Sequence, residues 1–205
     1  MQINPRKKKI LLTLDGFGQG GIQQAYKIFL AEYSKTFDEV YLMIMQSSEN
    51  ELLIEGFENS SILRVEGKHL LDWKSFLRFR RMLITTKPEV IIASMYRSQI
   101  WSALTNTKNS KLIWVEHNTY FGRSSLQWLI MRILSHRVDK IVGVSTEVSD
   151  YTGEKLKKSV STIPNPMTMP TIQSVQNTRP SDFVFIGRLT LQKNPELMLR
   201  IVQVS

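Results

Sequence analysis

Short runs of apolar residues alternate with segments of helical spacing over most of the sequence. The runs occupy residues 10–14, 40–45, 90–93, 112–115 and 141–144. Nearly continuous apolar strands are typical of parallel sheets, because helices cover both faces of such sheets. Their alternation with helices favours a doubly wound arrangement. The sequence therefore predicts an α/β fold with a Rossmann-like, doubly wound parallel sheet over residues 1–166.

The composition changes after this alternating region. Residues 167–182 are rich in Pro, Ser, Thr, Gln and Asn and show little apolar periodicity, which is typical of a linker between domains. Residues 183–186 form a further apolar run, and a helix is predicted to begin near residues 194–196. We therefore expect a domain at 1–166, a linker at 167–182, and the first βα unit of a second domain at 183–205.

Two cations lie between the predicted strand and helix of this last part. Gly187 permits a tight turn, and Arg188 and Lys193 follow it. Asn194 is suited to cap the helix that Pro195 begins. A guanidinium, an ammonium and the free N–H groups of a helix N-terminus can converge on one diphosphate. The pattern predicts an anion site, although two solvated cations in an ordinary turn would give the same letters.

A glycine-rich loop follows the first predicted strand. Gly16, Gly18 and Gly21 match the dinucleotide-binding fingerprint in their spacing. That fingerprint also needs a carboxylate near the end of the second strand, and residues 43–46 contain none. A phosphate-binding P-loop would need Lys where Ile22 stands. Neither nucleotide motif is complete.

His117 directly follows the predicted strand at residues 112–115 and is flanked by Glu116 and Asn118. In doubly wound sheets, ligands bind at the carboxyl ends of the strands. His117 is therefore a candidate substrate contact, while a purely structural role is equally open.

The residue types also limit the metal chemistry that we expect. The sequence has no cysteine, no His-Glu-x-x-His motif and no Asp-x-Asp pair. Thiolate and zincin sites are thereby excluded, and so is the carboxylate pair that would hold a metal on a nucleotide sugar. We expect no metal and no other cofactor.

Three segments resemble GT-B glycosyltransferases of family 4. Residues 183–194 are similar to the "FxGRLxxxKN" segment that holds the donor diphosphate in that family. Residues 20–23 are similar to the glycine loop of its first domain, and Asn165, between two prolines, is similar to its interdomain exit. The resemblance implies a retaining transfer of a sugar from a nucleotide-diphosphate sugar to a glycan or lipid-linked acceptor.

The resemblance also implies roles for individual residues. His117 would orient the transferred sugar in the catalytic site. The residues implied to hold the donor diphosphate are Arg188, Lys193, Gly20 and Gly21. Those implied on the acceptor side are Gly18, Gln23 and Asn118. Gln23 replaces the acidic residue that usually follows the glycines, so a role for that carboxylate is not carried over.

The resemblance ends early in the family's second domain. The later acidic motif, in which two Glu residues hold the donor, has no counterpart in the sequence. We therefore expect a family member truncated in its second domain, with the activity of the truncated chain left open. The alternative is a non-catalytic acceptor- or glycan-binding module. An NAD-dependent enzyme is disfavoured by the missing ribose carboxylate.

The net charge of +9 and the pI of about 9.8 favour anionic partners. We expect a nucleotide sugar and an anionic membrane surface to be among them, but not nucleic acid, because the basic segment at residues 78–81 has its aromatics at core spacing. The absence of cysteine fits a reducing compartment, so we expect a cytoplasmic protein that can contact the inner membrane face. The helix predicted at residues 126–135 is apolar nearly all round and is expected to be largely buried.

Overall fold

The computed structural model describes residues 7–16, 21–46, 60–105, 109–119, 122–167 and 194–204. The chain divides into two compact units, Met1–Thr168 and Met169–Ser205.

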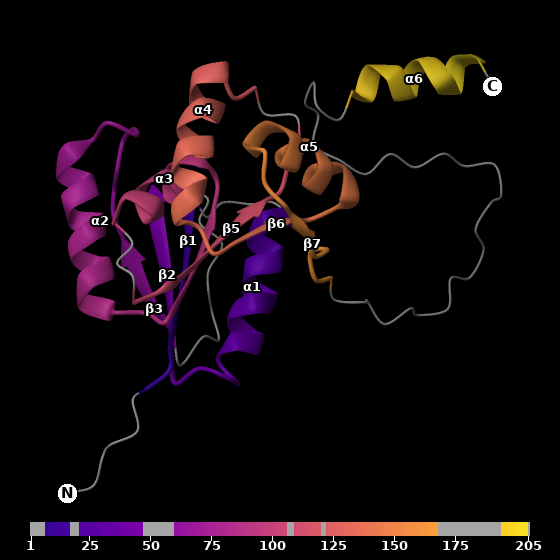
Figure 1. Cartoon of the computed structure of the whole chain (residues 1–205). Helices are drawn as coiled ribbons and strands as arrows, with labels where there is room; N and C mark the ends of the chain where they lie inside the picture. The colour runs from indigo at the N-terminus through magenta and orange to yellow at the C-terminus, as the bar shows by residue number, and fades with distance from the viewer. Residues whose placement is uncertain are drawn as a thin grey trace, which may run out of the picture. The chain divides into compact units, whose positions relative to one another are not determined.

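The first unit is built on a seven-stranded sheet in which every strand pair is parallel. The strands are β1 (Lys9–Gly16), β2 (Glu39–Gln46), β3 (Ser60–Arg64), β4 (Val90–Ser94), β5 (Lys111–Glu116), β6 (Lys140–Gly143) and β7 (Ser161–Thr162). Their spatial order is β3-β2-β1-β4-β5-β6-β7. The predicted α/β, Rossmann-like doubly wound parallel fold is confirmed (Figure 1).

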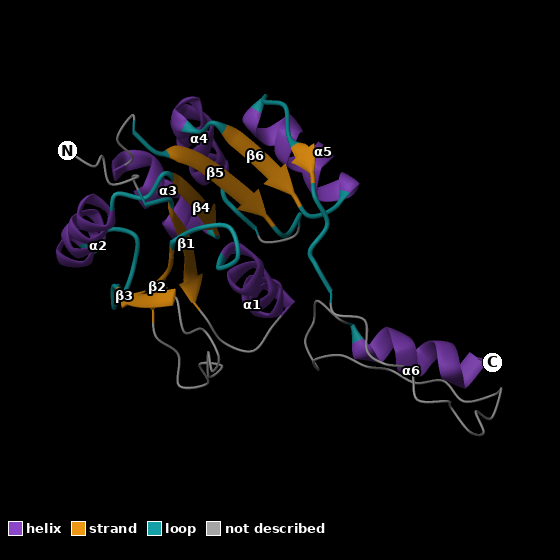
Figure 2. Ribbon diagram, turned by 90° about the horizontal axis from the view of Figure 1, so that it is seen from below, coloured by secondary structure: helices purple, strands orange, loops and turns teal. Residues whose placement is uncertain are grey.

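Helices connect these strands and cover the sheet. They are α1 (Gly21–Tyr33), α2 (Trp73–Thr86), α3 (Tyr96–Thr105), α4 (Ser125–Leu134), a single 3-10 turn η1 (Ser135–Arg137) and α5 (Thr146–Leu156). The connection through α1 moves the chain outward from β1 to β2, whereas the connections through α2, α3, α4 and α5 move it the other way. Because parallel crossovers are right-handed, α1 covers one face and the later helices cover the other (Figure 2).

The two faces of the sheet carry separate cores. Leu11 belongs to the core beneath α2, α3 and α4, where Trp101 and Trp114 are fully buried. Ile10 and Leu12 belong to the other core, beneath α1. Since successive side chains of a strand point to opposite faces, a strand covered on both sides must be apolar throughout. This explains the continuous apolar runs in the sequence.

The order of the strands reverses at the centre of the sheet. β1 and β4 are neighbours, and the chain continues from β1 to β2 on one side and from β4 to β5 on the other. Such a switch point leaves a crevice beyond the carboxyl ends of the strands. Asp15 at the end of β1, Met95 just beyond β4 and Glu116 at the end of β5 meet there.

The helix α4 corrects one expectation. It was predicted to be largely buried, but only Trp128 and Met131 are buried. The side chains of Leu126, Leu129 and Ile133 are 65%, 52% and 61% exposed. The helix lies at the surface of a single helical layer, so only one of its faces has a partner in the described part of the chain.

The described part of the second unit is the helix α6 (Pro195–Val204). The Asn194 side chain accepts a hydrogen bond from the backbone N–H of Leu197 at 3.3 Å, so the predicted N-cap is confirmed. The apolar run at residues 183–186 lies outside the described residues. Among the described residues, no helix combines the length and apolarity needed to cross a membrane.

Candidate functional site

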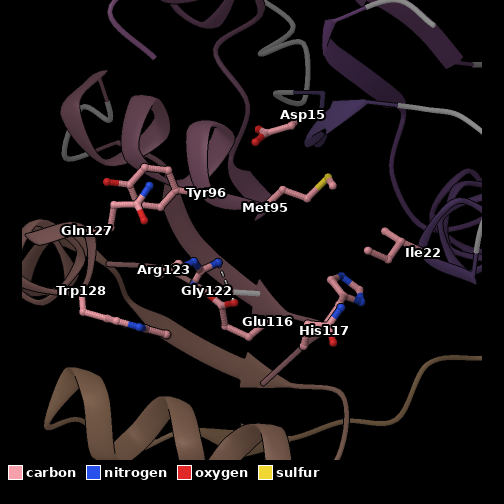
Figure 3. A pocket seen from close by; sticks show the side chains of 11 residues that line it. Asp15, Ile22, Met95, Tyr96, Glu116, His117, Gly122, Arg123, Gln127 and Trp128 are labelled. Carbon is pink, nitrogen blue, oxygen red and sulfur yellow. Dashed lines mark hydrogen bonds and ion pairs between the residues drawn. The ribbon is translucent and has the colours of Figure 1, made fainter. Parts of the chain in front are cut away.

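A cavity of about 370 Å³ lies at the switch point of the sheet. Its walls come from the ends of β1 and β5, the first turn of α1, the β4–α3 junction and the start of α4 (Figure 3). The side chains include the aromatic rings of Tyr96 and Trp128 beside polar groups such as His117 and Asn118. The site therefore combines apolar walls with a few hydrogen-bonding groups, as small-molecule sites usually do.

Asp15 joins the end of β1 to the start of α3. Its carboxylate accepts hydrogen bonds from the backbone N–H of Arg97 at 3.1 Å and of Ser98 at 2.7 Å, and from the Ser98 hydroxyl at 2.7 Å. A carboxylate at a helix N-terminus satisfies free N–H groups and complements the helix dipole. Asp15 is thus engaged in fixing the β4–α3 side of the cavity.

His117 is the end of a chain of side-chain hydrogen bonds. The Tyr26 hydroxyl donates to the Ser94 oxygen at 2.6 Å, and the Ser94 hydroxyl lies 3.1 Å from His117 Nε2. The buried Tyr26 hydroxyl uses the Ser94 oxygen as its acceptor. The hydroxyl hydrogen of Ser94 is therefore donated to Nε2 of His117. That assignment makes Nε2 an acceptor and leaves the ring hydrogen on Nδ1. Nδ1 is buried and has no hydrogen-bond partner in the described part of the chain.

Burial lowers the pKa of His117 from its usual 6.5 to about 4. The imidazole is therefore neutral near pH 7. It offers one N–H donor and carries no charge.

Lowering the pH from 7 to 5 is expected to destabilise the fold through His117. Because the folded pKa is about 4 and the unfolded one about 6.5, the unfolded chain takes up the proton first as the pH falls. The stabilisation is complete above pH 6.5 and is lost between 6.5 and 4, with about 2 kcal/mol lost by pH 5. Urea unfolding at both pH values should show this loss in the wild type. His117→Gln, which keeps an acceptor for Ser94 but does not titrate, should lack it, and an equal loss in both proteins would contradict the assignment.

A buried ion pair forms another wall of the cavity. The Arg123 guanidinium donates to both Glu116 carboxylate oxygens at 3.0 Å, and Gln99 donates to the same carboxylate at 2.9 Å. The side chains of Glu116 and Arg123 are only 4% and 14% exposed. The guanidinium also lies over the rings of Tyr96 and Trp128, at 5.7 and 4.8 Å from their centroids. This cluster anchors the segment before α4 to the end of β5.

Sequence reasoning did not single out Arg123. A usable signal was present, because Arg123 lies directly before Ser124, the N-cap of α4, and seven positions after a carboxylate at a strand end. Glu116 was considered only as a neighbour of His117. The structure instead gives it the central place in the ion-pair cluster.

Met95 is a further residue of the wall that the sequence did not indicate. Its backbone φ is 72°, in the left-handed region that non-glycine residues rarely occupy. Strained backbone of this kind is concentrated at binding and catalytic sites. Its position between β4 and α3 places its side chain in the cavity wall.

Of the other predicted site residues, Gly21, Gln23 and Asn118 are described. Gly21 opens α1, and a Cβ atom added there would meet no atom of the described structure within 4 Å. The Gln23 amide donates to the Gly16 carbonyl at 3.3 Å and so ties the helix to the end of β1. Asn118 lines the cavity. The remaining predicted residues, Gly18, Gly20, Arg188 and Lys193, lie outside the described residues.

The sequence model of Glycosyltransferase Family 4 matches residues 34–168. No curated protein matched the sequence. Two crystal structures of Anabaena Alr3699/HepE have similar folds, one in complex with UDP and glucose and one with UDP-glucose. Their TM-scores are 0.59 and 0.60 at 11% and 12% identity.

These matches cover 78% of the present chain but only 45% and 44% of the HepE chains, so the chain spans less than half the length of those proteins. At such low identity the likeness establishes the fold alone, which is that of a GT-B domain. The family match covers well over half of the sequence. The chain therefore belongs to glycosyltransferase family 4.

Proposed function

We propose that the protein takes part in transferring a sugar, with retention of configuration, from a nucleotide-diphosphate sugar to a glycan or lipid-linked acceptor. The observation that carries this proposal is the cavity at the switch point of the sheet, with the Nδ1 hydrogen of His117 left without a partner in the described structure. Membership of the family supports the reaction class. We place the reaction in the cytoplasm, where nucleotide sugars and reduced proteins coexist.

His117 has the chemistry of a group that orients a sugar. A buried N–H donor without a partner is costly, and a sugar hydroxyl oxygen would satisfy it. The neutral imidazole suits this task, because an imidazolium would place a charge in the buried site and its desolvation would weaken substrate binding. Asn118 adds a polar group to the same wall, and the aromatic rings of Tyr96 and Trp128 offer apolar surface to a sugar ring.

The donor diphosphate is assigned, in this proposal, to Arg188 and Lys193, with Gly20 and Gly21 allowing the backbone to approach it. α6 begins at Pro195, two residues after Lys193. A helix N-terminus favours anions, and fixed cations stabilise the charge that develops on a leaving diphosphate. In the same proposal residues 1–166 form the acceptor-side domain, 167–182 the linker, and 183–205 the start of the donor-binding domain. Gly18 and Gln23 belong to the acceptor side.

Calorimetric titration with UDP, GDP, ADP and their sugar conjugates tests this proposal. UDP-glucose is the first probe, because the HepE structures contain it or its parts. Arg188→Ala/Lys193→Ala is expected to weaken binding by at least about a hundredfold, since each of the two charged hydrogen bonds is worth about 1.5–3 kcal/mol. The matched control Lys35→Ala/Lys140→Ala removes the same charge from two exposed lysines elsewhere. Equal weakening in both variants would contradict the assignment.

A second candidate function is a non-catalytic module that binds the acceptor alone. It is favoured by one observation: every residue that lines the cavity belongs to the first unit. Binding of glycans in the absence of any nucleotide affinity would select the module. Nucleotide binding, or turnover of a nucleotide sugar that His117→Ala abolishes, would select the transferase.

A further inference from the structure

The exposed face of α4 is apolar. Leu126, Leu129 and Ile133 are 65%, 52% and 61% exposed, and their spacing of three and four residues aligns them in one row along the helix. Single exposed apolar residues are common on protein surfaces, but an aligned row indicates a binding surface.

The exposed face of α2 repeats this pattern. Trp73, Leu77 and Ile84 are 65%, 43% and 41% exposed. Together with Arg80 they follow the spacing i, i+4, i+7, i+11, which aligns them along one side of the helix. Both helices cover the same face of the sheet, with α3 between them (Figures 1 and 2).

The charged side chains within the bounds of α2, α3 and α4 have a single sign, and Asp72, the N-cap residue before Trp73, lies just outside those bounds. Within their bounds, α2, α3 and α4 contain no Asp or Glu. Their exposed cations include Lys74, Arg80, Arg81 and Arg132, and none of these four forms an ion pair with any described residue. An apolar row bordered by cations, with Trp at one end, is the pattern of helices that lie in the interface of an anionic bilayer.

The same charges argue against a second copy of the chain as the partner. A symmetric dimer through this face would bring the cations of one copy against those of the other. An anionic lipid surface instead complements the cations and takes up the apolar side chains.

We propose that this lipid face, formed by the outer sides of α2 and α4, binds the surface of a bilayer that contains anionic lipids. The proposal goes beyond the transfer reaction and does not depend on it. It also has a consequence for the site. Leu126 in the row is followed directly by Gln127 and Trp128, which line the cavity. Binding would hold the cavity close to the bilayer, where a lipid-linked acceptor resides.

Flotation of the full chain with lipid vesicles tests the proposal. We expect binding to vesicles of three parts phosphatidylcholine and one part phosphatidylglycerol, and at least about tenfold weaker binding to phosphatidylcholine alone. Leu129→Ser/Ile133→Ser and Arg80→Gln/Arg81→Gln should each weaken binding to the anionic vesicles by about tenfold or more. All four side chains are exposed, so the fold should be retained.

Two matched controls accompany these variants. Ile163→Ser/Met167→Ser replaces apolar residues of similar exposure, 48% and 78%, that follow β7. Lys35→Gln/Lys140→Gln removes two charges outside the face. Both controls should bind vesicles like the wild type. Equal loss in variant and control, unchanged binding by Leu129→Ser/Ile133→Ser, or dimerisation through the same residues without vesicle binding would overturn the proposal. Nucleotide titration of the same variants should be unaffected, which keeps the two tests separate.

Discussion

Arg123→Ala is expected to lower the free energy of unfolding by about 3–5 kcal/mol, because it leaves the buried Glu116 carboxylate without its counter-ion. The pair is bidentate, with both distances 3.0 Å, and neither side chain is more than 14% exposed. The guanidinium also loses its contacts with the Tyr96 and Trp128 rings. Urea unfolding at pH 7 measures the loss.

The double variant Arg123→Met/Glu116→Gln is the control for this prediction. It removes both charges and keeps most of the packed volume, and the amide that replaces the Glu116 carboxylate can still accept a hydrogen bond from Gln99. Replacing a whole buried pair by neutral groups is often tolerated, so the double variant should recover most of the stability.

Surface ion pairs are worth only about 0–1 kcal/mol. The exposed pair Lys111–Asp139, with side chains 75% and 40% exposed, provides that reference. A cost for Arg123→Ala as small as that of Lys111→Ala would contradict the buried-pair interpretation.

The fold was predictable because it depends on features that repeat along the chain. Each of the five apolar runs between residues 10 and 144 coincides with most of a strand, and its continuity reports burial on both faces. A local cap was also predictable: Asn194 caps α6 by accepting a hydrogen bond from the Leu197 N–H. These features depend on neighbouring residues, so a single sequence contains them.

The candidate site was predictable only in part. His117 and Asn118 were found because they follow a strand, and the ends of parallel strands meet at one edge. Arg123 was not found, because its partners are supplied by α3, α4 and β5, which only the folded chain brings together. The exposure of α4 was wrongly predicted for a related reason. An apolar helix can be buried by its own chain or by another partner, and the sequence pattern does not distinguish the two.

Gly143→Ala is expected to be among the most damaging single substitutions in the first unit. A Cβ atom at this position would lie 2.5 Å from the Ser149 hydroxyl oxygen, 2.8 Å from the Ser149 backbone nitrogen and 2.9 Å from its Cα. Two of these atoms are backbone, so no side-chain rotation relieves the clash. Helix α5 would have to move away from β6, which pairs with β5 through Gly143 and Glu116.

Such overpacking costs typically 1–3 kcal/mol and more where backbone must shift, so we expect a loss of about 3 kcal/mol or more in urea unfolding. Gly21→Ala is the control, because a Cβ there meets no described atom within 4 Å and Ala favours the helix that it would begin. That variant should be as stable as the wild type or slightly more stable. The absence of a side chain at Gly143 therefore lets α5 pack closely against β6. The residues next to Gly143 in the sequence do not reveal this role, because the contact is made by Ser149 in the first turn of α5. If Gly143→Ala were tolerated as well as Gly21→Ala, the close approach of α5 to the sheet would be wrong.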